Sequence, residues 1–267
     1  PEQKEILVQA LKSAGNTVAM TGDGVNDILA LKEADCSVAI AAGSDAARSV
    51  SHLVLLDSNF SSMPSVVAEG RRVVNNIQKS SSLFLMKTLF TIIVSIMVLI
   101  WGKSYPFSPV QFMVLEYFVI GLPSFFLALQ PNHNIIKGKF ISNLLKNALP
   151  AGLTLVLNAV AIYVYQHFMG ISNMTLATMA SITITCTGLI VLFNLCRPFN
   201  ALRSILMISM TALALSIIVF MPDLLTYVSL TTTELLFTII VIETSYPVYH
   251  MITKAFDSIK QITPEDS

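Results

Sequence analysis

The stretch Thr21-Gly22-Asp23-Gly24-Val25-Asn26-Asp27 decides how the first part of this chain is interpreted. It follows a short apolar run at residues 17–21, which is typical of a buried parallel strand. It precedes an amphipathic pattern over residues 25–34 that predicts a helix. Ligands of α/β folds bind where parallel strands end, so this stretch is a candidate ligand site.

The residue types in this stretch suit magnesium and phosphate. Asp23, Asp27 and Asn26 offer the oxygen ligands that Mg²⁺ prefers. Glycines let the backbone approach a phosphate closely, and the N-terminus of the following helix favours negative charge. The stretch contains no obvious nucleophile. The alternative is a turn rich in Asp and Asn that only caps the helix.

Helix and strand patterns alternate around this stretch. Residues 2–14 and 45–51 predict helices, whereas residues 37–41 and 53–56 predict strands. Strands separated by helices indicate a parallel sheet with right-handed crossovers. The alternation covers residues 1–61 only, which is too short for a complete domain of this class. We therefore expect earlier strands upstream of Pro1 and a chain that is the C-terminal piece of a longer protein.

The composition changes sharply after this soluble part. Over the whole chain 54% of residues are hydrophobic and 12% are charged, against about 25% charged residues in ordinary soluble domains. The net charge of zero gives no support for nucleic-acid binding. The three cysteines form no CxxC motif or Cys/His cluster and are expected to be packing residues.

Six apolar segments predict a bundle of transmembrane helices. Each has close to the roughly 20 residues that a spanning helix needs. The segments are 83–101, 110–129, 148–168, 175–196, 203–221 and 235–253. Residues 62–82 read as a connector helix between the soluble domain and the membrane, and residues 254–267 as a cytoplasmic tail.

The charges between these segments predict their orientation. If the soluble domain is cytoplasmic, the inside loops carry Lys137, Lys139, Lys146, Arg197, Arg203, Lys254 and Lys260. The outside loops carry only Lys103. This distribution follows the positive-inside rule, so both the soluble domain and the C-terminus are expected in the cytoplasm.

The motif at residues 21–27, continued by Ala30-Leu31-Lys32 and Ala34-Asp35, resembles the hinge motif of P-type (E1-E2) cation-transporting ATPases. The resemblance extends back to residues 1–4 and forward through 57–60 to 75–77, and the number of spans fits as well. It implies a partial α/β haloacid-dehalogenase-like domain with a parallel sheet, followed by an all-α six-helix transmembrane bundle.

The resemblance also implies roles for single residues. Asp23 would bind Mg²⁺ together with a phosphorylated aspartate that lies upstream, and Asn26 and Asp27 would order the phosphate site. Lys4 would offset phosphoryl charge, unless it is simply a solvated helix lysine. The cofactor-binding backbone would be that of Thr21, Gly22 and Gly24. The cofactors would be Mg²⁺ and ATP, with the nucleotide site largely outside this chain. Because the DKTGT aspartate is not in this sequence, the fragment alone is expected to be inactive.

Charged residues inside a span are costly and therefore candidates for function. Glu116 lies in the second span and Lys87 near the cytoplasmic end of the first. By resemblance Glu116, Thr88 and Thr91 fall on ion-ligand positions of related pumps. Glu116 is thus a candidate ligand for Ca²⁺ or another cation, with a structural hydrogen bond as the alternative. Lys87 either forms an internal counter-charge to Glu116 or extends to the membrane surface.

The resulting hypothesis is an ATP-driven cation pump of a bacterial plasma membrane, working through an aspartyl-phosphate intermediate. Its expected partners are the transported cation, membrane lipid and the missing N-terminal part of the same polypeptide. Two alternatives stay open, namely a lipid- or polyamine-translocating P-type ATPase and a non-catalytic membrane fragment. Other polar residues of the spans, such as Asn158 and Glu243, are expected mainly to hydrogen-bond between helices.

Overall fold

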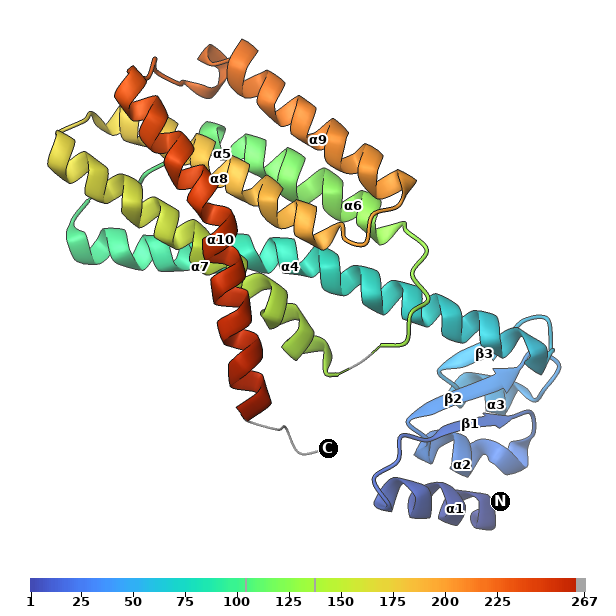
Figure 1. The fold of residues 1–267 in the computed structure, drawn as a ribbon. Helices are drawn as coiled ribbons and strands as arrows, with labels where there is room; N and C mark the ends of the chain where they lie inside the picture. The colour runs from blue at the N-terminus through green and yellow to red at the C-terminus, as the bar shows by residue number, and fades with distance from the viewer. Residues whose placement is uncertain (104, 137, 263–267) are drawn as a thin grey trace. The chain divides into compact units, whose positions relative to one another are not determined.

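A computed structural model describes residues 1–103, 105–136 and 138–262, with side chains described up to Ser258. Lys137, the side chain of Lys260 and residues 263–267 of the expected tail therefore lie outside the described residues. The chain divides into two compact units, residues 1–70 and 71–267, which we describe separately. Figure 1 shows a small α/β unit and a helical bundle.

The first unit is built on a parallel sheet of three strands in the order β1-β2-β3. The strands are β1 (Ala19–Gly22), β2 (Cys36–Ile40) and β3 (Leu53–Leu55). Ala19 pairs with Cys36 and Val38 with Leu53. The predicted parallel sheet is confirmed, with small shifts at the strand ends. β2 is the buried strand, as expected of the middle strand of a parallel sheet.

Three helices accompany this sheet, namely α1 (Glu2–Ser13), α2 (Ile28–Glu33) and α3 (Asp45–Val50). The helix predicted at residues 25–34 begins with a 3₁₀ turn, η1 (Val25–Asp27), and a second such turn, η2 (Phe60–Ser62), follows β3. Lys12 ties α1 to α2, since its Nζ lies 2.6 Å from the carbonyl oxygen of Glu33. The apolar face predicted for α1 is largely exposed within this unit, where Val8 is the buried residue of the helix.

The second unit contains most of six helices that are long and apolar enough to cross a membrane, which confirms the predicted number. The first, α4 (Met63–Trp101), joins the predicted connector, from Met63 onward, and the first apolar segment in one helix. The others are α5 to α6, α7 (Phe140–Met169), α8 (Asn173–Leu195), α9 (Ala201–Phe220) and α10 (Thr232–Ile262). Helices α7 and α10 extend well beyond their apolar segments, because helix formation continues into polar residues that the hydropathy pattern excludes.

The second spanning segment is not a regular α-helix. It consists of α5 (Pro109–Leu115), a π-helical turn η3 (Glu116–Gly121) and α6 (Leu122–Ala128). The amide of Leu122 donates to the carbonyl of Tyr117, five residues back. Pro123 has no N–H for the helix ladder, and its ring would press on the preceding turn. The wider π turn accommodates this proline, and such turns are frequent at functional sites.

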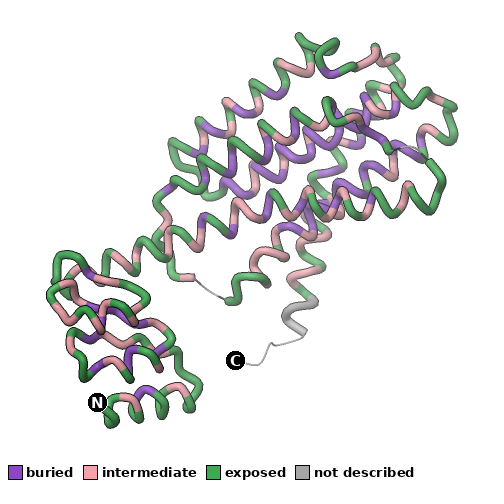
Figure 2. The backbone as a smooth tube through the Cα atoms, turned by 180° about the vertical axis from the view of Figure 1, so that it is seen from behind, coloured by how far each residue is buried: buried purple, intermediate pink, exposed green. Residues whose placement is uncertain are grey.

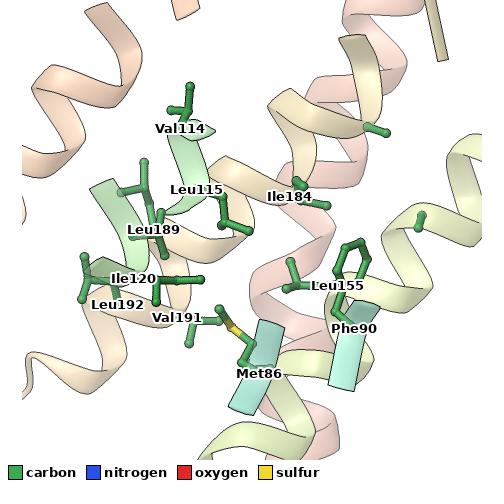
Figure 3. Close-up of a cluster of buried hydrophobic side chains, with 14 of the residues drawn as sticks. Met86, Phe90, Val114, Leu115, Ile120, Leu155, Ile184, Leu189, Val191 and Leu192 are labelled. Atoms are coloured by element: carbon green, nitrogen blue, oxygen red, sulfur yellow. The ribbon is translucent and has the colours of Figure 1, made fainter. Parts of the chain in front are cut away.

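Helix α8 lies at the centre of the bundle. In its most apolar stretch 72% of the residues are buried, against 22% for α9. Figure 2 shows this concentration of buried residues in the middle of the bundle. In Figure 3 apolar side chains from α4, α5, α7 and α8 gather into one cluster, among them Phe90, Leu115, Leu155 and Ile184. Polar groups also join helices here, since Asn158 Nδ2 lies 2.8 Å from Thr187 Oγ1 and 2.9 Å from Ser245 Oγ.

Candidate functional sites

The first candidate site is the turn that follows β1. Asp27 ends the 3₁₀ turn, and its side chain folds back toward the strand. Its Oδ2 accepts hydrogen bonds from the amides of Asp23 and Gly24, at 3.3 Å each. A Cβ atom at Gly22 would lie 2.6 Å from the Cβ of Asp27. Glycine at position 22 is therefore what lets the carboxylate reach the backbone of the turn.

Lys4 completes this arrangement from the first turn of α1. Its Nζ lies 2.6 Å from Asp27 Oδ1, and the Asp27 side chain is only 8% exposed while that of Lys4 is 57% exposed. The hydrogen bond from Lys4 is the main reason that the pKa of Asp27 lies below its ordinary value, and the two backbone amides act in the same direction. The same hydrogen bond raises the pKa of Lys4. Asp27 is therefore an ionised carboxylate held from three directions.

Asp23 differs from Asp27 because it is exposed, whereas Asp27 is buried. Only its backbone is held, since its carbonyl oxygen accepts a hydrogen bond of 2.7 Å from the amide of Ser44. A Cβ atom at Gly43 would lie 2.5 Å from that carbonyl oxygen. The sequence reading missed this contribution from the loop after β2. The available signal was a Gly-Ser pair at a strand end, with Ser44 capping α3.

The side chains of the two aspartates therefore have different hydrogen-bonding states. The Asp23 side chain makes no hydrogen bond or ion pair with any described residue, so its oxygens are available to a cation. Magnesium commonly takes one or two carboxylates and completes its shell with water and phosphate oxygens. A lone exposed carboxylate on a turn fits that pattern, although the described residues contain no cluster of three His, Cys, Asp or Glu side chains. Asp27, by contrast, is already fully engaged.

The remaining predicted residues of this site lie on the same turn. Thr21 is half-buried in β1, Gly24 precedes the 3₁₀ turn, and Asn26 is exposed within it. The structure thus brings Lys4, Asp23, Gly24 and Asp27 into direct contact through side chains or backbone. Among the described residues, the Asn26 side chain forms no hydrogen bond with Lys4 or Asp27.

The second candidate site lies in the bundle. Lys87 on α4 and Glu116 at the start of the π turn form an ion pair, with side chains 32% and 34% exposed. The Nζ of Lys87 also lies 5.7 Å from the centroid of the Phe112 ring, within the range of a cation–π contact. Of the two readings of Lys87, the structure therefore favours the counter-charge over extension to the membrane surface.

A cavity of about 350 Å³ adjoins this ion pair. It is lined by Lys87, Thr91, Tyr105, Phe107, Ser108, Pro109, Phe112 and Glu116. Thr88, also predicted for this site, is exposed and not among them, and its hydroxyl bonds the carbonyl of Phe84 in its own helix. Lys87 and Thr91 share a helix face because they are four residues apart, whereas Thr88 does not lie on it.

Helix α4 makes a second set of polar contacts nearer its N-terminal half. Asn76 Nδ2 lies 3.1 Å and 2.6 Å from the carbonyl oxygens of Ala128 and Gln130, at the end of α6. Lys79 Nζ lies 3.1 Å from the carbonyl of Leu195, at the end of α8. Carbonyls at helix ends lack partners within the helix. These two side chains therefore fasten α4 to two other spans, a role that the sequence reading missed for Lys79.

The structure places the two weaker candidates, Asn158 and Glu243, in different surroundings. Asn158 lies in the buried hydrogen-bond network of α7, α8 and α10, which confirms the expected packing role. Glu243 on α10 is exposed and forms no ion pair with a described residue. It lies outside the set of residues that line the cavity.

Comparison with known proteins gives several related sequences, although no family model matches the chain. The calcium-transporting ATPase CtpE of Mycolicibacterium smegmatis is 40% identical over 83% of this chain and 30% of its own length. A probable cation-transporting ATPase, exp7, of Streptococcus pneumoniae is 37% identical over 78% of this chain and 28% of its own length. A P-type sodium-transporting ATPase4 of Toxoplasma gondii is 42% identical over 49% of this chain and 10% of its own length. The chain thus spans less than a third of these relatives.

Proposed function

On the premise that this chain belongs to the P-type ATPases, we propose that the protein containing it moves a cation across a membrane, driven by ATP hydrolysis through an aspartyl-phosphate intermediate. The names of the relatives support a cation as substrate, since they specify calcium, an unnamed cation or sodium. The phosphorylated aspartate and most of the nucleotide site lie outside this chain. The chain alone is therefore proposed to be inactive.

The observation that carries this proposal is the division between Asp23 and Asp27. We assign Asp23 to Mg²⁺, which would supply positive charge to phosphate oxygens. Asp27 keeps the turn in shape through its bonds to two amides and Lys4. Lys4 is more than half exposed, so its remaining protons can face a phosphoryl group. Thr21, Gly22, Gly24 and Asn26 supply the backbone and amide surroundings of this group.

In the membrane, we assign Glu116 as a ligand of the transported cation, with Thr91 beside it on the cavity wall. A cation that binds Glu116 has to displace the ammonium group of Lys87. When the cation leaves, Lys87 can return and neutralise the carboxylate, which lowers the cost of a buried charge. Thr88 is not part of this assignment, because its side chain lies outside the cavity.

The proposed location is the plasma membrane of a bacterium, with the first unit and the C-terminus in the cytoplasm. This orientation rests on the loop charges. Among the described residues Lys139, Lys146, Arg197, Arg203 and Lys254 fall on one side, and Lys103 on the other. The relatives from Mycolicibacterium and Streptococcus support a bacterial protein.

A polyamine is the second candidate substrate. The cavity is large for a single metal ion, and two of its walls are aromatic rings, Phe107 and Phe112, which attract ammonium groups. Among the described residues, Glu116 is the one carboxylate that lines it, whereas calcium usually takes six to eight oxygen ligands. The names of the relatives favour a metal cation and give no support to a lipid substrate.

The test uses the purified full-length protein. Its ATPase activity is measured with Ca²⁺, Mn²⁺, Na⁺, K⁺, spermidine and phospholipid in turn. One of the four metal cations should stimulate it. Glu116→Gln should abolish that stimulation, because the ligand loses its charge. Glu243→Gln is the matched control, since Glu243 is a carboxylate in a span but away from the cavity, and it should retain stimulation. If the cation dependence of Glu116→Gln is unchanged, Glu116 is not a ligand of the transported cation. Stimulation by spermidine alone would favour a polyamine as the substrate.

A further inference from the structure

Helix α8 approaches the second span so closely at Gly188 that no side chain fits between them. A Cβ atom at this position would lie 2.8 Å from Leu115 Cδ1 and 2.9 Å from Val119 Cγ1. A Cβ atom essentially never makes contacts under 3.0 Å, so a methyl group here would force a neighbour to move. Leu115 directly precedes Glu116, and Val119 lies inside the same π turn. Gly188 therefore packs against the two residues that flank the proposed cation ligand.

The two side chains that meet Gly188 have little room to yield. Leu115 and Val119 are fully buried and belong to the apolar cluster of the bundle, and Figure 3 shows Leu115 within it. Such interiors contain few voids. Val119 is β-branched, so its side chain is stiff about χ1. An added methyl group at position 188 would therefore push on the backbone of η3 and not only on the ends of side chains.

Helix α8 is anchored to other helices next to Gly188. Thr187 Oγ1 lies 2.8 Å from Asn158 Nδ2 on α7 and 3.1 Å from Ser245 Oγ on α10. Buried side-chain hydrogen bonds of this kind hold spanning helices together. The π turn is held less firmly, because Pro123 offers no N–H to the helix ladder. A clash at Gly188 is therefore relieved by a shift of η3 and not of α8.

We propose that Gly188 is a positioning residue of the transport site, which holds Glu116 in place beside Lys87 because its lack of a side chain lets η3 seat against α8. This proposal rests on the function proposed above for Glu116. Lys87 meets Glu116 from α4, whereas Gly188 acts from α8 through Leu115 and Val119. The affinity of a site for a cation depends on where its ligands are held. A shift of η3 therefore changes that affinity.

The cation affinity of the purified full-length protein tests this role. Gly188→Ala should raise the cation concentration that gives half-maximal ATPase stimulation about tenfold, at the lower end of what overpacking a core costs. The maximal rate should stay nearly unchanged, because the groups that react with phosphate lie in the other unit. Val119→Ile enlarges the same contact from the other side. It should raise the half-maximal concentration likewise, and it replaces Gly188→Ala if that protein does not fold.

Rescue by a change of size distinguishes positioning from a general loss of packing. Adding Val119→Ala to Gly188→Ala should restore the affinity, because it removes the methyl groups that the new side chain meets. Val94→Ala is the matched control, since Val94 is an equally buried valine on α4 and is not among the nearest neighbours of Gly188. With Val94→Ala the affinity should stay low. Unchanged affinity in Gly188→Ala, or equal recovery with both alanines, would overturn the proposal.

A cross-linking experiment separates this proposal from the assignment of Glu116. In full-length protein without other cysteines, a short bifunctional thiol reagent joins Lys87→Cys to Glu116→Cys. Adding Gly188→Ala should slow the cross-linking, and adding Val119→Ala as well should restore its rate. If cross-linking responds in this way while Glu116→Gln keeps its cation dependence, Gly188 positions the turn but Glu116 is not the ligand. If the cross-linking rate does not change, Gly188 is not a positioning residue, whatever Glu116 binds.

Discussion

The pair of Lys4 and Asp27 and the pair of Lys87 and Glu116 join the same chemical groups but hold them differently. Asp27 is almost fully buried and also bonds two backbone amides, whereas its lysine is mostly exposed. Glu116 and Lys87 are each about one third exposed beside a cavity. Within the described part of the chain, Glu116 accepts no hydrogen bond from a backbone amide. One carboxylate is locked into its turn, and the other can exchange its partner.

This difference suits the two proposed roles. A carboxylate that shapes a phosphate site has to stay in place during each catalytic cycle, and additional backbone donors serve that purpose. A carboxylate that binds and releases a cation needs a partner it can leave at little cost. A partly exposed ion pair contributes only modestly to stability. The contrast between a locked pair and an exchangeable pair can be tested by substitutions in each.

The largest effect is expected for Asp27→Ala in the full-length protein. The substitution leaves Lys4 and the amides of Asp23 and Gly24 without their acceptor. We expect phosphorylation by ATP to fall about a hundredfold, together with lower thermal stability, because several charge-assisted hydrogen bonds are lost at once. Phosphoenzyme formation from labelled ATP measures this. Asp45→Ala is the control, since Asp45 is exposed and its ion-pair partner among the described residues is Arg48 of the same helix. Normal phosphorylation in Asp27→Ala would show that phosphorylation does not require the pair of Lys4 and Asp27.

A smaller effect is expected for Lys87→Met, which should strengthen cation binding where Asp27→Ala weakens phosphorylation. Without the ammonium group, a cation no longer has to displace a competitor from Glu116. The concentration of cation that gives half-maximal ATPase stimulation should fall about fivefold, as expected for a partly exposed ion pair of about 1 kcal/mol. Lys103→Met, a lysine between α4 and α5 outside the cavity, should leave it unchanged. A weaker cation affinity in Lys87→Met would mean that Lys87 positions Glu116 and does not compete for it.

The smallest effect concerns the pH dependence of stability at the first pair. The lowered pKa of Asp27 contributes stability above the ordinary value of 3.8 and loses it as the pH falls through the native value. The raised pKa of Lys4 contributes stability below its ordinary value of 10.5 and loses it as the pH rises through the native value. The unfolding midpoints of wild type and Lys4→Met should therefore differ most between these two values and converge outside them. A constant difference at every pH would contradict an electrostatic origin.

The sequence predicted most of the α/β unit and all six candidate spans because these depend on short-range patterns. Apolar runs of a given length predict strands and spanning helices wherever they occur. The π turn Glu116–Gly121 was not predicted, because an apolar run of suitable length indicates a span but not the kind of helical turn within it. The exposed apolar face of α1 shows the limit of periodicity, which predicts that a helix has such a face but not which residues cover it.

The candidate sites were predictable in part. Lys87 and Glu116 stood out because charge is costly inside a span. The choice of Thr91 over Thr88 could have been made from helical spacing, since Thr91 lies one turn from Lys87. Phe107 carried no such signal. It lines the cavity beside the ion pair because its ring packs against those of Phe90 and Phe112.

The sequence by itself determined the class of the fold, the number of candidate spans and the turn at Asp23 to Asp27, because each is encoded in neighbouring residues. Only the tertiary structure decided which aspartate is locked and which is free, and that Lys87 meets Glu116. These contacts join residues far apart in the chain. They depend on how closely Gly22 lets Asp27 approach and on how α4 and α5 pack, and no local pattern of residues specifies either.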